Sequence, residues 1–128
     1  MRPTRSPALR GLFGLARIAM MLGYVWCATT AVWPGVLDMN VAIRGGIAAF
    51  FLGQACSHAV FGVARMRGGD CEAERILRGY QLQWHGNIAS GVLVGIGALW
   101  HGGAIGFLVA YAALSFAWFW YWVWPGIE

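Results

Sequence analysis

The stretch Ala104–Trp124 reads AIGFLVAYAALSFAWFWYWVW and contains no charged residue. A helix of about 20 mostly apolar residues is long enough to cross the hydrocarbon core of a bilayer. The stretch therefore predicts a transmembrane helix over 104–124, and the following Pro125-Gly126 predicts its end. Three further apolar stretches precede it, at about 11–33, 41–64 and 79–100. The sequence thus predicts an all-α membrane protein with four transmembrane helices.

The composition leaves little room for a soluble domain. Of the 128 residues, 59% are hydrophobic and 11% are charged, against about 25% charged in an average soluble domain. The mean hydropathy is +0.61. We expect a single four-helix transmembrane domain over residues 11–128, preceded by a short disordered basic arm at 1–10. No A-x-A cleavage motif closes the first apolar run, so we interpret this run as an uncleaved helix rather than as a signal peptide.

The distribution of arginine predicts the orientation. The chain has nine arginines and no lysine, and its formal net charge is +4. Arg44 is alone on one side of the predicted bundle, and the other side holds Arg2, Arg5, Arg10, Arg17, Arg65, Arg67, Arg75 and Arg78. Because basic residues concentrate on the cytoplasmic side of membrane proteins, we predict two antiparallel hairpins with both termini in the cytoplasm. We therefore expect a multi-pass protein of the bacterial inner membrane.

The same arginines flank apolar runs, so they favour contact with lipid headgroups over nucleic acid, for which no binding module is present. Arg17 lies inside the first run, two turns from its start, and we expect its side chain to reach the interface. In this orientation an aromatic belt at the cytoplasmic interface is predicted for Trp118, Phe119, Trp120, Tyr121, Trp122 and Trp124.

Polar side chains gather in the third predicted helix. Gln81 and His85 are spaced i, i+4 and share a face, with Gln83, Asn87 and Ser90 nearby. The second helix carries a matching pair, Gln54 and His58. His58 precedes Cys71 by thirteen residues and His85 follows it by fourteen, so both lie at similar depth in an antiparallel hairpin. We predict that Gln54 or His58 hydrogen-bonds with Gln81 or His85, because polar groups in lipid are costly when unpaired.

Two interpretations of this polar face stay open. The two histidines could share a ligand, such as a b-type haem, a metal or a quinone, or the faces could simply fix helix pairing through hydrogen bonds. The predicted membrane segments contain no Asp or Glu, and no catalytic set is recognisable, which argues against an enzyme and against coupled transport. The isolated Cys27, Cys56 and Cys71 do not support a disulfide framework or a zinc site. We expect no bound metal or cofactor.

Glycine is frequent, with 19 residues, and predicts close helix packing. Gly91-x-x-x-Gly95 and Gly102-x-x-x-Gly106 match the GxxxG pattern of membrane helix contacts. We expect Gly45, Gly46, Gly91 and Gly95 to lie where helices approach one another closely.

Three segments resemble a known family: AIRGGIAAFFL at 42–52, FGVAR at 61–65 and AERILRGY at 73–80. Together they resemble the ATP synthase protein I family, small four-helix membrane proteins encoded with F-type ATP synthase. The family carries a Gly-Glu pair and a following Lys early in its third helix, and Gln83, Trp84 and Asn87 occupy those positions here. The chain thus resembles a divergent member that lacks this charged signature.

The resemblance implies a non-enzymatic, cofactor-free accessory protein that helps to assemble the ring of c subunits. A magnesium-handling role has also been suggested for the family, and it would not survive loss of the charges unchanged. We expect the partner to contact the polar face formed by Gln54, His58, Gln81, His85 and Asn87. Association with a second copy of the chain is a further alternative. The competing hypothesis is a small membrane anchor of a respiratory complex that binds haem b or quinone between the second and third helices.

Overall fold

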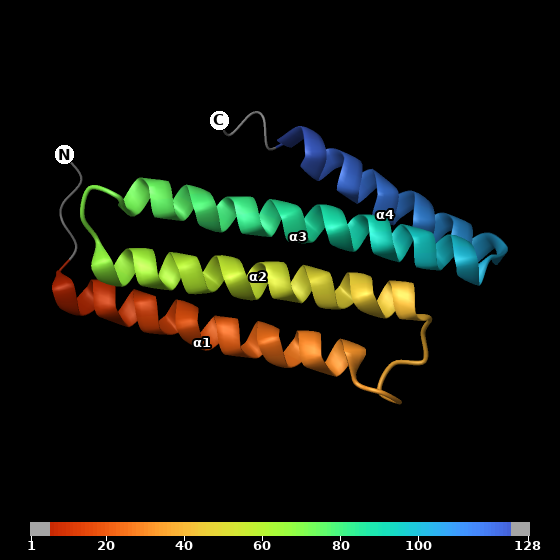
Figure 1. Ribbon diagram of the computed structural model, residues 1–128, viewed down its shortest axis with the longest axis horizontal. Coiled ribbons are helices and arrows are strands. Elements are labelled where there is room, and N and C mark those ends of the chain that lie inside the picture. Colours follow the sequence, from red (N-terminus) through yellow and green to blue (C-terminus); the bar gives the residue numbers. More distant parts are fainter. Residues whose placement is uncertain (1–5, 124–128) are drawn as a thin grey trace.

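The computed structural model describes residues 6–123, and this part of the chain consists of four α-helices and their connections. The helices are α1 (Pro7–Val32), α2 (Val41–Arg67), α3 (Glu72–His101) and α4 (Gly103–Val123) (Figure 1). The prediction of an all-α fold with four helices is confirmed. Residues 7–10, which were predicted to belong to a disordered basic arm at 1–10, are part of α1. Residues 1–5 and Trp124 lie outside the described residues.

The helix ends follow from local sequence. Ser6 Oγ accepts a hydrogen bond from the Leu9 N–H at 3.3 Å, and Asn40 Oδ1 accepts one from the Ile43 N–H at 3.1 Å. Both side chains therefore cap an N-terminus that lacks backbone partners. Gly68 ends α2 and Gly102 ends α3, with φ of 60° and 77°, values that favour glycine. α2 consequently continues to Arg67, three residues past its predicted end at Ala64.

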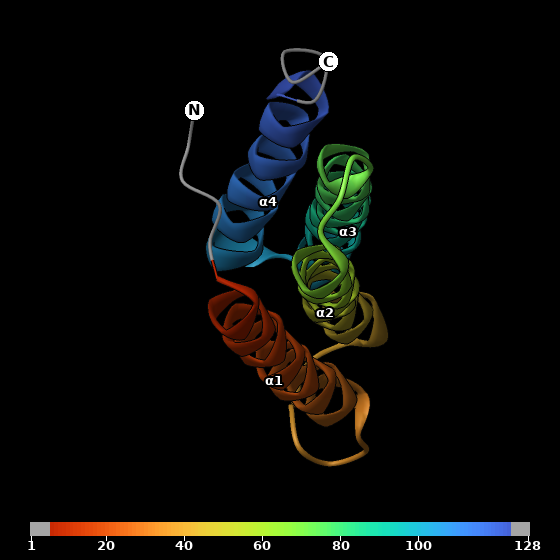
Figure 2. The same ribbon diagram turned by 90° about the vertical axis from the view of Figure 1, so that its left-hand side faces the viewer.

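The four helices form a single row in chain order (Figure 1). α2 and α3 make the most extensive contact, α1 packs on α2, and α4 packs on α3. The two predicted hairpins, α1–α2 and α3–α4, are thus present and are joined through α2 and α3. Figure 2 shows that α1 and α4 bend toward the same side of the α2–α3 pair. We call that side the concave face and the opposite side the convex face.

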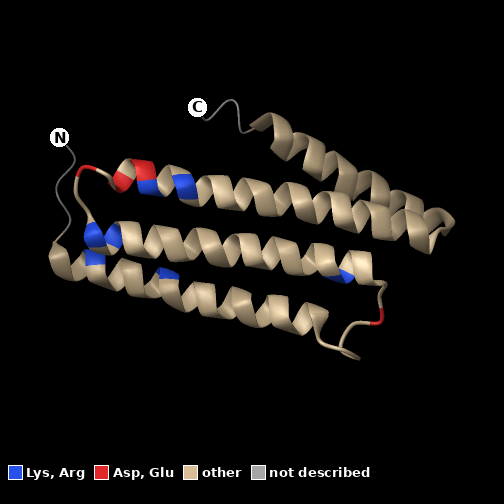
Figure 3. Ribbon diagram, in the orientation of Figure 1, with Lys and Arg blue, Asp and Glu red and all other residues tan. Residues whose placement is uncertain are grey.

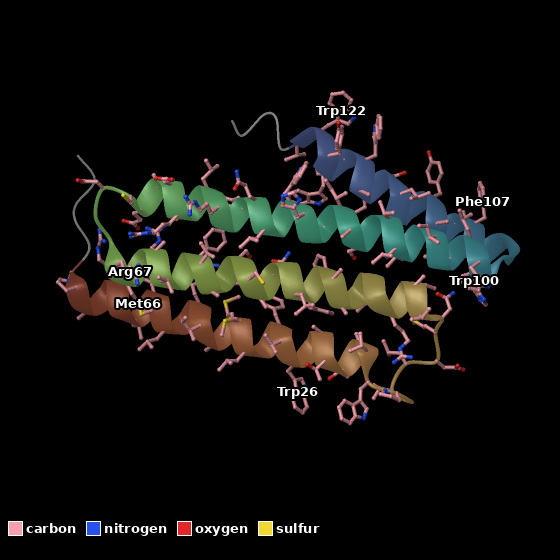
Figure 4. The ribbon with its side chains drawn as sticks, viewed as in Figure 1. Trp26, Met66, Arg67, Trp100, Phe107 and Trp122 are labelled. Carbon is pink, nitrogen blue, oxygen red and sulfur yellow. The ribbon has the colours of Figure 1, made fainter. Side chains whose placement is uncertain are left out.

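Small residues form the interior of the row. The buried hydrophobic residues of the described chain are all alanines, whereas large apolar side chains such as Trp26, Trp100, Phe107 and Trp122 point outward (Figure 4). α2 and α3 approach each other closely at two glycines, where a Cβ added to Gly86 would lie 2.8 Å from Gly53 Cα. Small residues inside and large apolar residues outside are typical of helices that pack in lipid.

Three of the helices, α1, α2 and α4, are long and apolar enough to cross a membrane. α3 has 30 residues and is therefore longer than any of them, but it carries more polar side chains. The chain is thus a helical protein with the properties of a multi-pass membrane protein.

Charged residues gather at one end of the helices, where α1 begins and where α2 is connected to α3 (Figure 3). Among the described residues, Arg44 is the arginine at the opposite end. Its guanidinium donates to the carbonyls of Ala31, at 3.1 Å, and of Val32. These carbonyls belong to the last turn of α1, which lacks intrahelical partners. Arg44 therefore ties the end of α1 to the start of α2.

Candidate functional site

Arg17 and His58 form a hydrogen bond between α1 and α2. Arg17 Nη1 lies 3.0 Å from His58 Nδ1. Because a guanidinium only donates hydrogen bonds, Nδ1 is the acceptor and the ring proton lies on Nε2. The Arg17 guanidinium also lies over the Phe61 ring, 5.6 Å from its centroid. The side chain, which was expected to reach the membrane interface, contacts a neighbouring helix.

Aromatic rings hold the His58 imidazole in place. The Tyr24 ring stacks on it with centroids 5.2 Å apart and planes 13° from parallel. The Phe61 ring meets His58 edge-on at 6.1 Å and meets Tyr80 of α3 at 5.1 Å. Arg17, Tyr24, His58, Phe61 and Tyr80 therefore form one continuous set of contacts from α1 through α2 to α3. We call these five residues the Arg17 cluster.

The Arg17 cluster lies on the concave face. On α2, Gly62 faces α1 and Gly53 faces α3. At 100° per residue, His58 lies between these two directions on the side toward which α1 and α4 bend. Arg17 and Tyr80 are exposed there, and a small polar pocket lies between them beside Arg65.

The polar side chains of α2 and α3 pair differently from the prediction. Gln83 Nε2 donates to Gln54 Oε1 at 3.4 Å, whereas Gln81 and His85 line a groove on the convex face. The predicted bond from Gln54 or His58 to Gln81 or His85 is therefore wrong in its α3 partner. Gln81 and Gln83 are two residues apart and point to nearly opposite sides of the helix.

His58 and His85 do not share a site. His58 faces Arg17 on the concave side, while His85 lines the convex groove and contacts the Trp84 ring, 4.8 Å away. The two imidazoles therefore do not converge on a gap between α2 and α3, as two axial ligands of one haem would. Within residues 6–123, no three His, Cys, Asp or Glu side chains gather in a way that could hold a metal ion.

Asn87 is buried, with 2% of its surface exposed, and its Oδ1 accepts no hydrogen bond from the described residues.

The predicted packing glycines fall in different environments. Gly46 lies against Val94 of α3, and Gly91 lies against Ala113 and Ala117 of α4. Gly95 lies against Leu114 of α4. No atom lies within 4 Å of a Cβ placed on Gly45, so the predicted packing role of Gly45 is wrong.

The predicted aromatic belt lies at the end of α4. Trp118, Phe119, Tyr121 and Trp122 are exposed, while the Trp120 carbonyl accepts a hydrogen bond from Trp84 Nε1 of α3. This bond and the Gly91 contact attach α4 to the row. The outward rings form an apolar and aromatic surface suited to a membrane interface.

The chain matches no protein-family model, no curated protein and no solved structure. The Arg17 cluster and the convex groove are therefore judged on their own chemistry. Sequence reasoning did not assign Arg17, Tyr24, Phe61 or Tyr80 to the site. The signal that could have found the cluster was Arg17 itself, a charge inside an apolar run that requires a polar partner.

Proposed function

We propose that this chain is a non-enzymatic accessory protein of the bacterial inner membrane that assists the assembly of another membrane protein through helix–helix contact. The concave face is the observation that supports this function most directly. α1 and α4 stand at its two edges and pack on α2 and α3 rather than extensively on each other. Arg17 and Tyr80 are exposed between these edges. A guanidinium has five N–H donors, so Arg17 retains donors for a partner helix beyond its bond to His58.

In this proposal all four helices cross the membrane. The end of α2 and the start of α4 lie at opposite ends of the bundle along the helix axes, and α3 is the segment that connects them. If α2 and α4 cross the bilayer, α3 crosses it as well. We place both termini and the α2–α3 connection in the cytoplasm. The support is the distribution of arginine between the two ends of the helices. Arg44 lies at one end, and the other end, which includes the α2–α3 connection, carries Arg10, Arg17, Arg65, Arg67, Arg75 and Arg78.

We propose the c subunits of F-type ATP synthase as the partner. The resemblance of residues 42–80 to the ATP synthase protein I family supports this choice, together with the small size of the chain. The respiratory-anchor hypothesis loses its specific support, since His58 and His85 lie on opposite faces of the α2–α3 pair.

Site-specific photocrosslinking in cell membranes tests the proposal. Replacing Tyr80 with p-benzoylphenylalanine places the probe on the concave face, and Leu82 provides a control on the same turn of α3. We expect a c-subunit adduct from position 80 and none from position 82. Equal adducts from both positions, or none from position 80, would contradict the proposal. An adduct with a second copy of the chain, or with a different protein, would replace c subunits as the partner.

A further inference from the structure

A groove of about 610 Å³ lies on the convex face between α2 and α3, at the end of these helices where charged residues gather. Three arginines, Arg67, Arg75 and Arg78, line it at that end. Its remaining wall includes the apolar side chains of Val63 and Leu82. The groove thus combines a basic rim with an apolar floor.

The groove arginines are less neutralised than Arg10 and Arg65, which lie at the same end of the helices. Arg10 and Arg65 both pair with Glu72, at 3.5 Å and 3.1 Å. Arg78 pairs with Glu74 at 3.2 Å, but both side chains are mostly exposed, at 70% and 65%. An exposed pair of this kind is weak.

Arg67 and Arg75 make no side-chain hydrogen bond or ion pair with any described residue. With Glu74 counted, the rim therefore carries a net positive charge and has guanidinium donors to spare for an anion.

The depth of the groove matches the boundary between lipid headgroups and hydrocarbon. The 30 residues of α3 make it about 45 Å long, against roughly 30 Å for the hydrocarbon core. The first turns of α3, which carry Arg75 and Arg78, therefore extend into the headgroup region. Gln81 and His85 lie about one and two turns deeper, beside the apolar floor.

We propose that this groove binds an anionic phospholipid. Arg67, Arg75 and Arg78 hold its phosphate, Gln81 and His85 face its glycerol ester region, and one acyl chain lies on Val63 and Leu82. Charge complementarity favours an anionic lipid, and the apolar floor favours a lipid over a soluble phosphate. Basic pockets between transmembrane helices on the cytoplasmic side recognise such headgroups. This site lies on the face opposite the Arg17 cluster and does not depend on the proposed partner.

Equilibrium binding to the full-length protein in neutral detergent tests the proposal, with phosphatidylglycerol and phosphatidylcholine as probes. We expect one phosphatidylglycerol to bind per chain, in preference to phosphatidylcholine. Arg75→Gln should weaken this binding about fivefold, the factor that corresponds to roughly 1 kcal/mol for one basic residue at a membrane surface. Arg65→Gln makes the same change of charge on the concave face, next to the same connection, and should leave binding unchanged.

Val63→Trp tests the groove by shape instead of charge. Val63 is exposed on the convex face, so a larger side chain is compatible with folding, which circular dichroism verifies. This variant should also lose the bound lipid. Equal losses for Arg65→Gln and Arg75→Gln, no loss for Val63→Trp, or equal binding of both lipids would overturn the proposal. Displacement of the lipid by millimolar inorganic phosphate would instead assign a soluble-anion site and overturn it too.

Discussion

Arg17 illustrates how a charged residue is accommodated inside an apolar helix. A guanidinium in a membrane segment is costly unless it has polar partners, and this one has His58 at 3.0 Å and the face of Phe61 at 5.6 Å. Tyr24 stacks on the same imidazole and limits its rotation. The bond therefore links α1 to α2 at a defined register, and it leaves part of the guanidinium exposed on the concave face.

A double-mutant cycle with Arg17→Met and His58→Phe should reveal this coupling. Each single variant leaves one polar group without its partner, whereas the double variant removes both groups. We expect a coupling free energy of about 0.6 kcal/mol and at most roughly 1.7 kcal/mol, the range for hydrogen bonds between membrane helices. Unfolding by SDS titration in mixed micelles measures it. Additive losses would show that the two side chains do not interact in the folded protein.

Residue type and depth can be predicted from this sequence better than the face on which a side chain lies. The antiparallel hairpin predicted that His58 and His85 lie at similar depth. The close contact of Gly53 with Gly86 places His85 near the level of Gln54, one turn from His58. Their faces could not be predicted, because 100° per residue turns a small error in helix contact into a change of side. Gln83 instead of Gln81 pairs with Gln54 for this reason.

At the scale of helices, the α2–α3 contact depends on backbone approach at Gly53 and Gly86. A methyl group on Gly86 would meet the Gly53 Cα at 2.8 Å, and backbone atoms cannot move aside as a flexible side chain can. Gly45 lies on the same helix as Gly53, but a methyl group added to Gly45 would have no atom within 4 Å. The two sites thus separate helix propensity from helix packing.

Gly86→Ala should therefore destabilise the protein, while Gly45→Ala should not. We expect the free energy of unfolding to fall by roughly 1–3 kcal/mol for Gly86→Ala, the usual cost of overpacking. Gly45→Ala should be neutral or stabilising by up to about 1 kcal/mol, because alanine favours the helix. SDS titration of both variants provides the comparison. A loss of stability at Gly45 equal to that at Gly86 would contradict the assigned contact.

Helix number and approximate bounds could be predicted because length and hydropathy fix them. The details that differ have local causes: Ser6 and Pro7 start α1 before Gly11, and Gly68 lets α2 continue to Arg67. The arrangement of the helices in an open row could not be predicted. It depends on which small residues meet, such as Gly91 with Ala117 and Gly62 with Gly14, and apolar periodicity does not identify partners when every face is apolar.

At the scale of the whole molecule, the proposed number of membrane crossings depends on α3. It is the most polar of the four helices, and α1, α2 and α4 are the ones whose hydropathy meets the requirement for a span. In the proposed four-span topology α3 crosses despite its polar side chains, because it lies between α2 and α4. Several of them, including Gln83, Asn87 and Ser90, are wholly or partly buried against these neighbours.

Reporter fusions should show four crossings with both termini in the cytoplasm. Alkaline phosphatase is active only outside the cytoplasm, so a fusion after Gly102 should be active and a fusion after residue 128 should be inactive. A fluorescent-protein reporter at the same positions should give the opposite pattern. The truncation after Gly102 removes α4. Because α3 is the one helix on which α4 packs extensively, α1, α2 and α3 keep their contacts with one another. Fusions at Asp38 and Asp70, in the two earlier connections, calibrate the active and inactive levels. Without a crossing by α3, the Gly102 fusion would be inactive and the residue 128 fusion active, and the four-span topology would be wrong.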